Sequence, residues 1–365
     1  MLKPFLTPCP QGRRDRFASR GSLVTEAPAA LVSAALAGLI LLGCSAPASR
    51  QGSWDTALTI DEKVQLTQKL GGEGTPAAVS LLIEATKDPV EEARIEAIRG
   101  LGQTGRKEVL PTLDALSRSE LRPVRQTVAI ALGQVKDQES VRILGSMARD
   151  PEFAVRSQVI GSLAALKLRE GAPILVECAL KETSETLRDA AVGVLTDWKE
   201  RSGVPIFEQA LRSETDEIRG HAAAALGTVG DASCIPALVG ALKDPNPVVR
   251  GASVLSIARI GDKGSLPVLR AQAEKETDAL SRATMAWGIA LLDGAPGGPD
   301  RQWAVSELEK ILLDVSQADF ARAQSAKALG DLQICGSKPS LTRAMNDRKG
   351  IVKKAVNNAL AAIKC

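Results

Sequence analysis

The stretch KDPNPVVRGASVLSIARIGD, from Lys243 to Asp262, contains the pattern that decides the fold. Its arginine, Arg250, has a basic counterpart at regular intervals along the chain. The counterparts are Lys63, Arg94, Arg125, Arg156, Arg188, Arg219, Arg282, Arg322 and Lys353. Neighbouring members are 31 or 32 residues apart, except that Arg282 and Arg322 are 40 residues apart. The chain therefore contains an internal repeat, and a repeat of this length is typical of a linear array.

Each repeat contains an amphipathic helix around its basic residue. A small or apolar residue follows three positions later, as Ala222 follows Arg219. A large aliphatic residue follows seven positions later, as Leu226 does, and both classes recur in all ten repeats. Offsets of three and seven lie on one stripe of an α-helix. The pattern therefore predicts one buried helix face in each repeat.

The other half of each repeat carries proline and turn residues. Proline lies fourteen or fifteen residues before the basic residue in six repeats, at Pro111, Pro173, Pro205, Pro236, Pro267 and Pro339. Proline is tolerated in the first turn of a helix because the amide there has no partner. Asp, Glu or Ser stands six residues before each basic residue from Arg94 onward, which is typical of a turn or a helix cap. The unit is therefore helix, turn, helix, and it must stack on copies of itself to bury its apolar stripe.

The pattern Asp-Pro…Val-Arg-x-x-Ala-x-x-x-Leu-Gly resembles HEAT-type repeats, specifically the short class shared with phycobilisome lyases, over residues 59–365. The resemblance implies an all-α fold. The expected architecture is an α-solenoid of stacked antiparallel helix pairs, with about nine HEAT-like repeats after an N-terminal half-repeat. Because such arrays serve many tasks, the resemblance indicates the fold much more strongly than the function.

The resemblance also implies roles for two sets of residues. The repeated arginine and the turn acid form a structural ladder between units in this family. The corresponding residues here are Arg94, Arg125, Arg156, Arg188, Arg219 and Arg250, with Asp88, Asp150 and Asp244. The second helix of each pair lines the concave face in this family. The candidate binding residues on that face are Arg99, Gln126, Gln158, His221, Trp287 and Lys327.

The N-terminus has the pattern of an export signal. Four arginines precede the uncharged segment LVSAALAGLILL, residues 31–42, which is shorter than the ~20 residues of a membrane span. The ending Leu-Leu-Gly-Cys resembles the lipobox of bacterial lipoproteins, which implies acylation of Cys44. We expect a signal peptide over residues 1–43 and a flexible tether over residues 44–58. An uncleaved anchor, an ordinary signal or a degenerate twin-arginine signal are the alternatives. Ser45 after the cysteine favours the outer membrane over the inner membrane.

The 40-residue step contains LLDGAPGGPDRQW, residues 291–303. Its glycines and prolines do not continue a helix, so we expect an inserted loop near residues 293–302. This loop either contacts a partner or is a tolerated insertion. Cys335 and Cys365 lie at nearly matching places in consecutive repeats. Stacked equivalents stand roughly 10 Å apart, beyond disulfide reach without local adjustment, so their pairing is left open.

The residue content argues against catalysis and against nucleic acid. His221 is the single histidine, so the two-iron site of the HEAT-fold enzyme deoxyhypusine hydroxylase cannot be built. The sequence contains neither a phosphate-binding glycine loop nor closely spaced cysteine pairs for zinc. The net charge of +3 comes from residues 1–43, and residues 44–365 hold equal numbers of basic and acidic residues. A neutral array without a basic stripe is a poor nucleic-acid binder.

These observations predict a non-catalytic, membrane-anchored scaffold of the bacterial cell envelope, facing the periplasm and needing no cofactor. Its partner would be a protein, bound on the concave face or on the 293–302 loop. One alternative is a structural or spacer lipoprotein. Another, by analogy with the phycobilisome lyases, is a lyase-type accessory that acts on a bound protein.

Overall fold

The computed structural model of the chain describes residues 53–364. Within this range it contains nineteen α-helices, five short 3₁₀ helices and no strand. The all-α solenoid of stacked helix pairs is therefore confirmed. The predicted signal peptide and the lipidation residue Cys44 lie outside the described residues.

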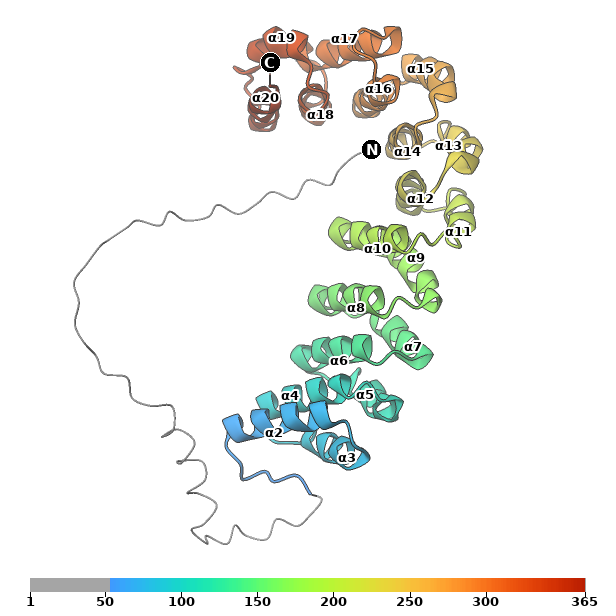
Figure 1. Cartoon of the computed structure of the whole chain (residues 1–365). Coiled ribbons are helices and arrows are strands. Elements are labelled where there is room, and N and C mark those ends of the chain that lie inside the picture. The colour runs from blue at the N-terminus through green and yellow to red at the C-terminus, as the bar shows by residue number, and fades with distance from the viewer. Residues whose placement is uncertain (1–52, 365) are drawn as a thin grey trace, which may run out of the picture. The chain divides into compact units, whose positions relative to one another are not determined.

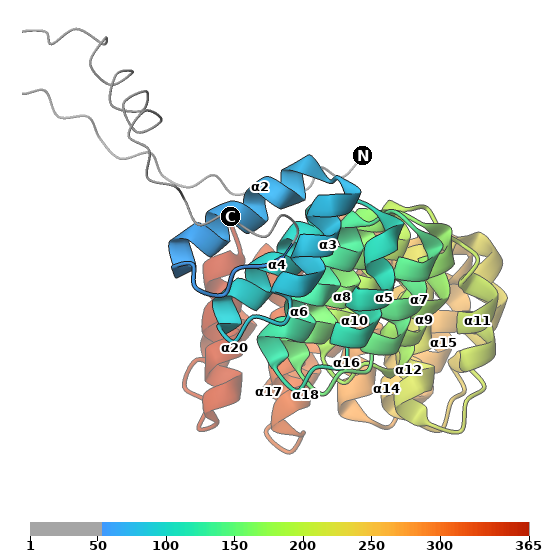
Figure 2. The ribbon, with the colours of Figure 1, turned by 90° about the horizontal axis from the view of Figure 1, so that it is seen from below.

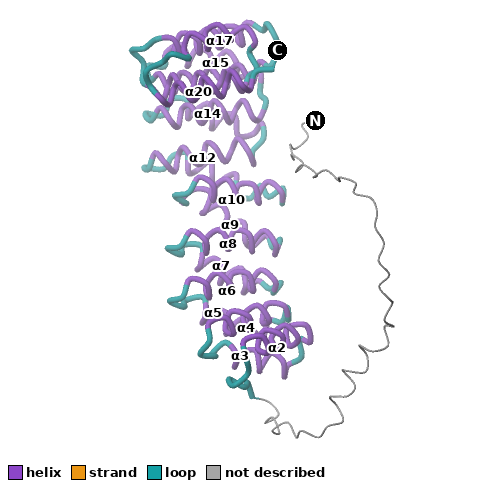
Figure 3. The backbone as a smooth tube through the Cα atoms, turned by 90° about the vertical axis from the view of Figure 1, so that its left-hand side faces the viewer, coloured by secondary structure: helices purple, strands orange, loops and turns teal. Residues whose placement is uncertain are grey.

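The helices that carry the repeated basic residue form an inner row on the concave side of the array (Figure 1). They are α2 (Ile60–Glu73), α4 (Glu91–Gln103), α6 (Arg122–Gln134), α8 (Phe153–Leu166), α10 (Glu185–Asp197), α12 (Asp216–Val229), α14 (Pro247–Ile260), α16 (Ala279–Asp293), α18 (Asp319–Asp331) and α20 (Gly350–Ala362). Figure 3 shows helices of this row lying one above another, with loops at their ends.

The remaining helices form an outer row. They are α3 (Pro76–Ala85), α5 (Leu110–Leu116), α7 (Gln138–Met147), α9 (Ala172–Lys181), α11 (Val204–Ala210), α13 (Ile235–Ala241), α15 (Leu266–Lys275), α17 (Pro299–Leu313) and α19 (Lys338–Ala344). The 3₁₀ helices lead into five of them and are η2 (Lys107–Val109), η3 (Arg169–Gly171), η4 (Ala232–Cys234), η5 (Lys263–Ser265) and η6 (Cys335–Ser337). Figure 2 shows the two rows from below, with α4 and α6 on one side and α5 and α7 on the other.

The core lies between the two rows and follows the sequence pattern. Every residue three or seven positions after the repeated basic residue is buried, except Leu66 and Leu360. These two belong to the first and the last inner helix, each of which has a neighbour in the row on one side only. The six prolines stand at the first turn of α5, α9, α11, α13, α15 and α19. The unit is therefore the predicted helix, turn, helix.

Small residues allow neighbouring inner helices to approach closely. A Cβ atom at Gly227 of α12 would lie 2.6 Å from the Cβ of Ser256 in α14. A Cβ at Gly102 of α4 would lie 2.8 Å from the Cβ of Ala131 in α6. Such distances leave no room for a side chain. The helices of the inner row pack more closely on one another than the helices of the outer row do. This difference is consistent with the inner row lying on the concave side.

The array begins earlier than residue 59, which corrects the predicted tether boundary. The backbone N–H of Trp54 donates to the Glu84 carboxylate at 2.8 Å, and the Trp54 indole donates to Asp88 at 2.7 Å. The Lys63 ammonium donates to the carbonyl oxygen of Thr56 at 2.9 Å. Residues 53–58 therefore belong to the folded body, because hydrogen bonds join them to α2, to α3 and to the turn after α3.

The loop predicted near residues 293–302 is also shorter than expected. Helix α16 ends at Asp293 and α17 begins at Pro299, so only residues 294–298 are non-helical. The extra length lies in α17, which has 15 residues where the other outer helices have 7 or 10. Proline at the first helical position allows this helix to begin early. The Asp293 carboxylate accepts from the backbone N–H of Arg301 at 2.8 Å and so ties α16 to the start of α17.

The cysteines within residues 53–364 fall into two groups. Cys178 and Cys234 are buried free thiols. Cys335 is disulfide-bonded, at the start of η6. Cys365 lies outside the described residues, so its pairing with Cys335 stays a prediction.

Candidate protein-binding surface

Ion pairs join successive repeats beside the turn between helices. Arg125 of α6 donates from Nε and Nη2 to the two oxygens of Asp150, at 2.6 and 3.0 Å. Its Nη1 also donates to the carbonyl oxygen of Ser119 in its own turn, at 2.8 Å. The row of such pairs is Lys63–Asp88, Arg125–Asp150, Arg156–Glu182, Arg219–Asp244, Arg250–Glu276, Arg282–Glu307 and Arg322–Asp347. We call this row the ladder. Each pair connects one repeat to the next.

The ladder has two gaps, at Arg94 and Arg188. No ion pair joins either arginine to a described carboxylate, because the turn position of the next repeat holds Ser119 or Ser213. Arg188 still donates to the carbonyl oxygens of Glu182 and Thr183, at 2.8 and 3.0 Å. The serine hydroxyls still accept from the turn backbone, as Ser213 does from the N–H of Thr215 at 3.3 Å. At these two positions serine keeps the turn but supplies no carboxylate for the bond between repeats, whereas beside Ser316 the bond is formed by Glu307 of α17 with Arg282.

Most of the ladder carboxylates have a lowered pKa despite their burial. Burial alone would raise the pKa of Asp150, but hydrogen bonds from Arg125 and from the backbone N–H of Glu152 outweigh it. The pKa of Asp150 therefore lies below its ordinary value of 3.8. The pKa values of Glu182, Asp244, Glu276 and Asp347 are lowered in the same way, against the effect of burial, by the arginine and by a turn N–H. Their charge stabilises the array and is not available for proton transfer near neutral pH.

The six candidate binding residues all stand on inner helices, but they differ in accessibility. Arg99 and Lys327 are exposed, whereas Gln126, Gln158, His221 and Trp287 are half-buried. Arg99 forms an ion pair with Glu96 on the same helix. Gln158 donates to the hydroxyl of Ser162 at 3.3 Å. They are spread over six inner helices, so they do not form one site.

His221 does not lie free on this face. Its Nδ1 is 2.7 Å from the carbonyl oxygen of Leu180, near the end of α9. The carbonyls of the last turn of a helix lack intrahelical partners, and the imidazole N–H satisfies one of them. His221 thus joins α12 to α9. This contact runs between repeats and could not be read from the sequence, because it crosses from the inner row to the outer row.

Trp287 and Lys327 form a pair on neighbouring inner helices. The Lys327 ammonium lies 4.4 Å from the centroid of the Trp287 ring, within the range of a cation–π contact. It is also 3.1 Å from the Asp331 carboxylate. The indole Nε1 of Trp287 is buried and has no hydrogen-bond partner among the described residues. This pair lies beside a groove of about 470 Å³ between α16, α18 and α20.

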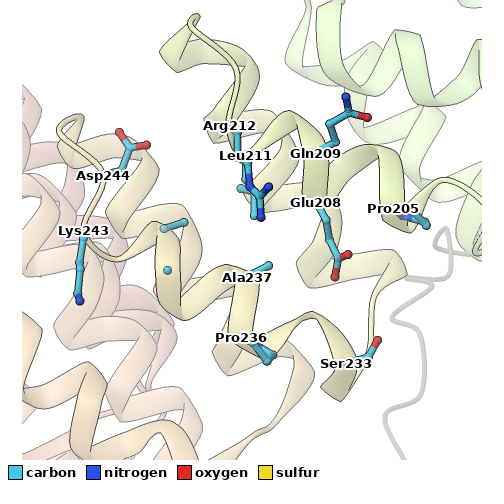
Figure 4. Close-up of a pocket in the computed structure, with 12 residues that line it drawn as sticks. Pro205, Glu208, Gln209, Leu211, Arg212, Ser233, Pro236, Ala237, Lys243 and Asp244 are labelled. Atoms are coloured by element: carbon cyan, nitrogen blue, oxygen red, sulfur yellow. The ribbon is translucent and has the colours of Figure 1, made fainter.

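A larger groove of about 790 Å³ lies in the outer row, between α11 and α13 (Figure 4). Its lining includes Glu208 from α11, Arg212 from the turn after α11, Pro236 and Ala237 from α13, and Lys243. The groove is the space between these two short outer helices. Another groove, of about 490 Å³, lies beside the 294–298 loop and is lined by Pro296, Arg301 and Val305, among others.

The described residues offer little reactive chemistry. Burial, with the nearby carboxylates of Glu182 and Glu177, raises the pKa of the Cys178 thiol to about 11, so this thiol is protonated at neutral pH. A protonated, buried thiol is a poor nucleophile. Between residues 53 and 364 no group of His, Cys, Asp and Glu is placed to hold a metal ion. In the same range, no helix combines the length and the apolar character needed to cross a membrane.

The stacked helix pairs define an α-solenoid. The family model for HEAT repeats matches residues 112–196 and 204–290, which lie within this array. The chain is a HEAT-repeat protein. No curated protein matches its sequence.

Solved structures of similar fold are long solenoids. A Kap121p mutant matches with a TM-score of 0.59 at 12% identity, covering 84% of this chain and 39% of that one. Yeast importin-β, Kap95p, matches with a TM-score of 0.51 at 12% identity, covering 83% of this chain and 52% of that one. The chain thus spans about half of these proteins or less. The complex of CpcE and CpcF of phycocyanin lyase from a Nostoc species matches at 18% identity, covering 64% of this chain and 94% of that one, with a TM-score of 0.31.

Proposed function

We propose that this protein is a lipid-anchored, non-catalytic scaffold that binds a protein partner in the bacterial cell envelope. The observation that carries the proposal is the inner row of ten helices, which lies on the concave side of the array. Concave solenoid surfaces of this kind are extended binding surfaces. The fold likewise binds protein in a relative, since Kap95 has been solved in complex with Nup1.

The anchor rests on the sequence of the N-terminus. The segment Leu-Leu-Gly-Cys at residues 41–44 supports acylation of Cys44 after removal of residues 1–43. A lipid there would hold the array at a membrane surface, facing the periplasm. Ser45 supports the outer membrane. Stable anchoring takes more than one acyl chain, and we therefore expect that Cys44 carries at least two.

A binding role also fits the chemistry of the array. The ring of the single histidine, His221, is hydrogen-bonded to a backbone carbonyl oxygen, and the Cys178 thiol is neutral and buried. Hydrogen bonds from Ser316 and Gln317 lower the pKa of Asp314 to about 2, and the ladder carboxylates are paired with arginine. The side chains on the concave face are of mixed character, which suits a protein segment better than a polyanion.

The anchor is tested by intact-mass analysis of the chain purified from bacterial membranes. We expect a mature protein that starts at Cys44 with at least two acyl chains, and a Cys44→Ala variant that leaves the membrane fraction. Wild-type protein that lacks acyl chains would refute the anchor.

Partner binding is tested by photo-cross-linking in cells. A photoreactive residue at Gln158 or Lys327 probes the concave face, one at Pro296 probes the 294–298 loop, and one at Ile206 of α11 is the matched position on the outer row. We expect the same discrete protein adduct from the concave positions and none from Ile206, which is 43% exposed. An adduct from Pro296 would add the loop to the binding surface. Anchored protein without adducts from any position would favour the spacer role and refute the scaffold.

A further inference from the structure

A row of exposed apolar residues runs across the last four inner helices. Its members stand two positions before the repeated basic residue: Val248, Leu280, Phe320 and Ile351, with exposed fractions of 65%, 37%, 67% and 41%. At the same position the six preceding repeats hold Asp61, Glu92, Pro123, Ala154, Thr186 and Glu217. Single exposed apolar residues are common on protein surfaces, but an aligned row over neighbouring helices indicates an interaction site.

Three of these residues border the groove of about 470 Å³ between α16, α18 and α20. Leu280 and Phe320 line it directly, and Ile351 lies one helical turn before the lining residue Ala355. The lining of α20 is small, with Ala355, Ala359 and Ala362. Helices α18 and α20 approach closely, because a Cβ at Gly330 would lie 2.9 Å from the Cβ of Ala359. The groove therefore has an apolar rim at one end and small side chains along its α20 side.

The repeat beside this groove is strongly basic. Residues 338–364 contain a single acidic residue, Asp347, and it is buried against Arg322. The same residues contain seven basic side chains, at Lys338, Arg343, Arg348, Lys349, Lys353, Lys354 and Lys364. All but Lys338 are exposed. No other repeat has such an imbalance, and residues 44–337 hold more acidic than basic side chains. Lys354 lies one turn before the groove residue Asn358 on α20, so part of this charge faces the groove.

The opposite side of the groove carries a further cation. Lys327 of α18 lines it, with its ammonium over Trp287 and near Asp331. Lys327 is 57% exposed, so a ligand carboxylate can reach it. A ligand in the groove would therefore contact the apolar row, with Lys327 on one side and Lys354 on the other.

We propose that this C-terminal groove binds an acidic amphipathic helix of the partner protein, an inference that rests on the scaffold function proposed above. Neighbouring helices in such arrays lie 8–10 Å apart, and residues seven positions apart on a helix are separated by about 10 Å along one face. A helix laid across α16, α18 and α20 would thus present apolar residues, one heptad apart, to Leu280, Phe320 and Ile351 in turn. Its carboxylates would meet Lys327 and Lys354. A flat lipid surface fits less well, because the helices that carry the apolar row lie on the concave side of the array.

Binding is measured by fluorescence anisotropy with the full chain in detergent. The probe is a labelled 21-residue peptide with leucine at two positions of each heptad, glutamate at the positions that flank the leucines and alanine elsewhere. The matched peptide carries lysine in place of every glutamate. We expect the glutamate peptide to bind at least ten-fold more tightly than the lysine peptide. Equal affinities, or no binding of the glutamate peptide, would overturn the inference.

Three variants locate the site. The double variant Leu280→Ala/Phe320→Ala should weaken binding of the glutamate peptide at least five-fold. The double variant Lys327→Glu/Lys354→Glu should reverse the preference between the two peptides. Val315→Ala is the control, because Val315 is 80% exposed and lies outside the groove. Circular dichroism shows whether each variant is folded. An equal loss in the control would contradict the assigned site.

Two further measurements separate this inference from its alternatives. In cells, a photoreactive residue at Phe320 should give the adduct seen from Gln158, and Lys327→Glu/Lys354→Glu should abolish the adduct at Phe320. An adduct at Gln158 without one at Phe320 would leave the scaffold standing and refute the groove. Vesicles containing phosphatidylglycerol should not compete with the peptide. Competition that is independent of Phe320 would assign the basic repeat to a lipid surface and overturn the proposal.

Discussion

At the scale of single residues, four ladder arginines hold their own turn and also join the next repeat, namely Arg125, Arg156, Arg219 and Arg250. Arg125 and Arg188 make the same bonds to turn carbonyls, but only Arg125 has a carboxylate partner. In the pair, the Arg125 and Asp150 side chains are 12% and 7% exposed. Removing Arg125 therefore leaves a largely buried carboxylate without its counter-ion.

We expect Arg125→Ala to lower the free energy of unfolding by about 3 kcal/mol. Arg188→Ala should lower it by about 1 kcal/mol, since it loses hydrogen bonds to the turn only. Urea denaturation of both variants measures the difference. Equal losses would show that the ion pair contributes nothing beyond the turn.

The lowered carboxylate pKa values predict how stability depends on pH. A carboxylate whose pKa is lower in the folded chain stabilises it above the unfolded pKa, and this contribution is lost as pH falls through the folded pKa. The ordinary values are 3.8 for Asp150 and 4.5 for Glu182. We therefore expect the melting temperature to be steady near neutral pH and to fall below about pH 4. Thermal melts over this range test it, and Arg125→Ala should show a smaller fall than the wild type.

At the scale of helices, the spacing within the inner row depends on small residues. Gly227 of α12 faces Ser256 with no room for a Cβ, whereas a Cβ at Gly193 of α10 would meet nothing within 4 Å. Both glycines lie inside helices. Gly227→Ala should destabilise the protein by about 1–3 kcal/mol through overpacking. Gly193→Ala should stabilise it by roughly 0.5–1 kcal/mol through helix propensity. Urea denaturation compares the two, and a stabilising Gly227→Ala would refute the close approach of α12 and α14.

The helical pattern in the sequence was sufficient to predict each inner helix. The apolar residues three and seven positions after Arg219 and its equivalents form a pattern within one short segment of the chain. The length of helix α17 was not foreseen. The glycines and prolines of residues 291–303 indicated a long loop, but Pro299 begins a helix. The length of this helix depends on the space available beside α16 and α18, and a local sequence pattern carries no information about that space.

At the scale of the whole array, the seam around α10 is the weakest. Helix α10 packs mainly against its own partner α9 and less closely on α8 and α12 than the other inner helices pack on their neighbours. The adjoining ladder position is the gap at Arg188, and α12 reaches across to α9 through His221. Repeat arrays are stabilised by contacts between neighbours, so a loose seam should open before the rest.

Hydrogen exchange measures this difference directly. We expect amides of α9 and α10 to exchange at lower opening free energy than those of α4 and α6. Ser213→Asp should slow exchange at the seam, because Asp at this position stands 25 residues after Arg188, as Asp150 stands after Arg125. The double variant Arg188→Gln/Ser213→Asp should lose that gain. Uniform exchange along the array would contradict a weak seam.

The end of the array provides a further prediction. Because Cys335 is disulfide-bonded and Cys178 and Cys234 are free thiols, we expect peptide mapping without reductant to find a Cys335–Cys365 bridge. Reduction should lower the melting temperature of the wild type and leave Cys335→Ser unchanged. A free thiol at Cys365 would refute the pairing.

The sequence alone was enough to predict the repeat, the helix pairs and the buried stripe, because each follows from spacing within about thirty residues. It also pointed to Arg125 and Asp150 as partners through the family resemblance. Tertiary structure decided that His221 bonds the end of α9 and that Leu280, Phe320 and Ile351 border one groove beside a basic repeat. These features depend on which side chains of separate repeats meet in space. The stacking of the repeats sets the distances between those side chains, and the order of residues along the chain does not.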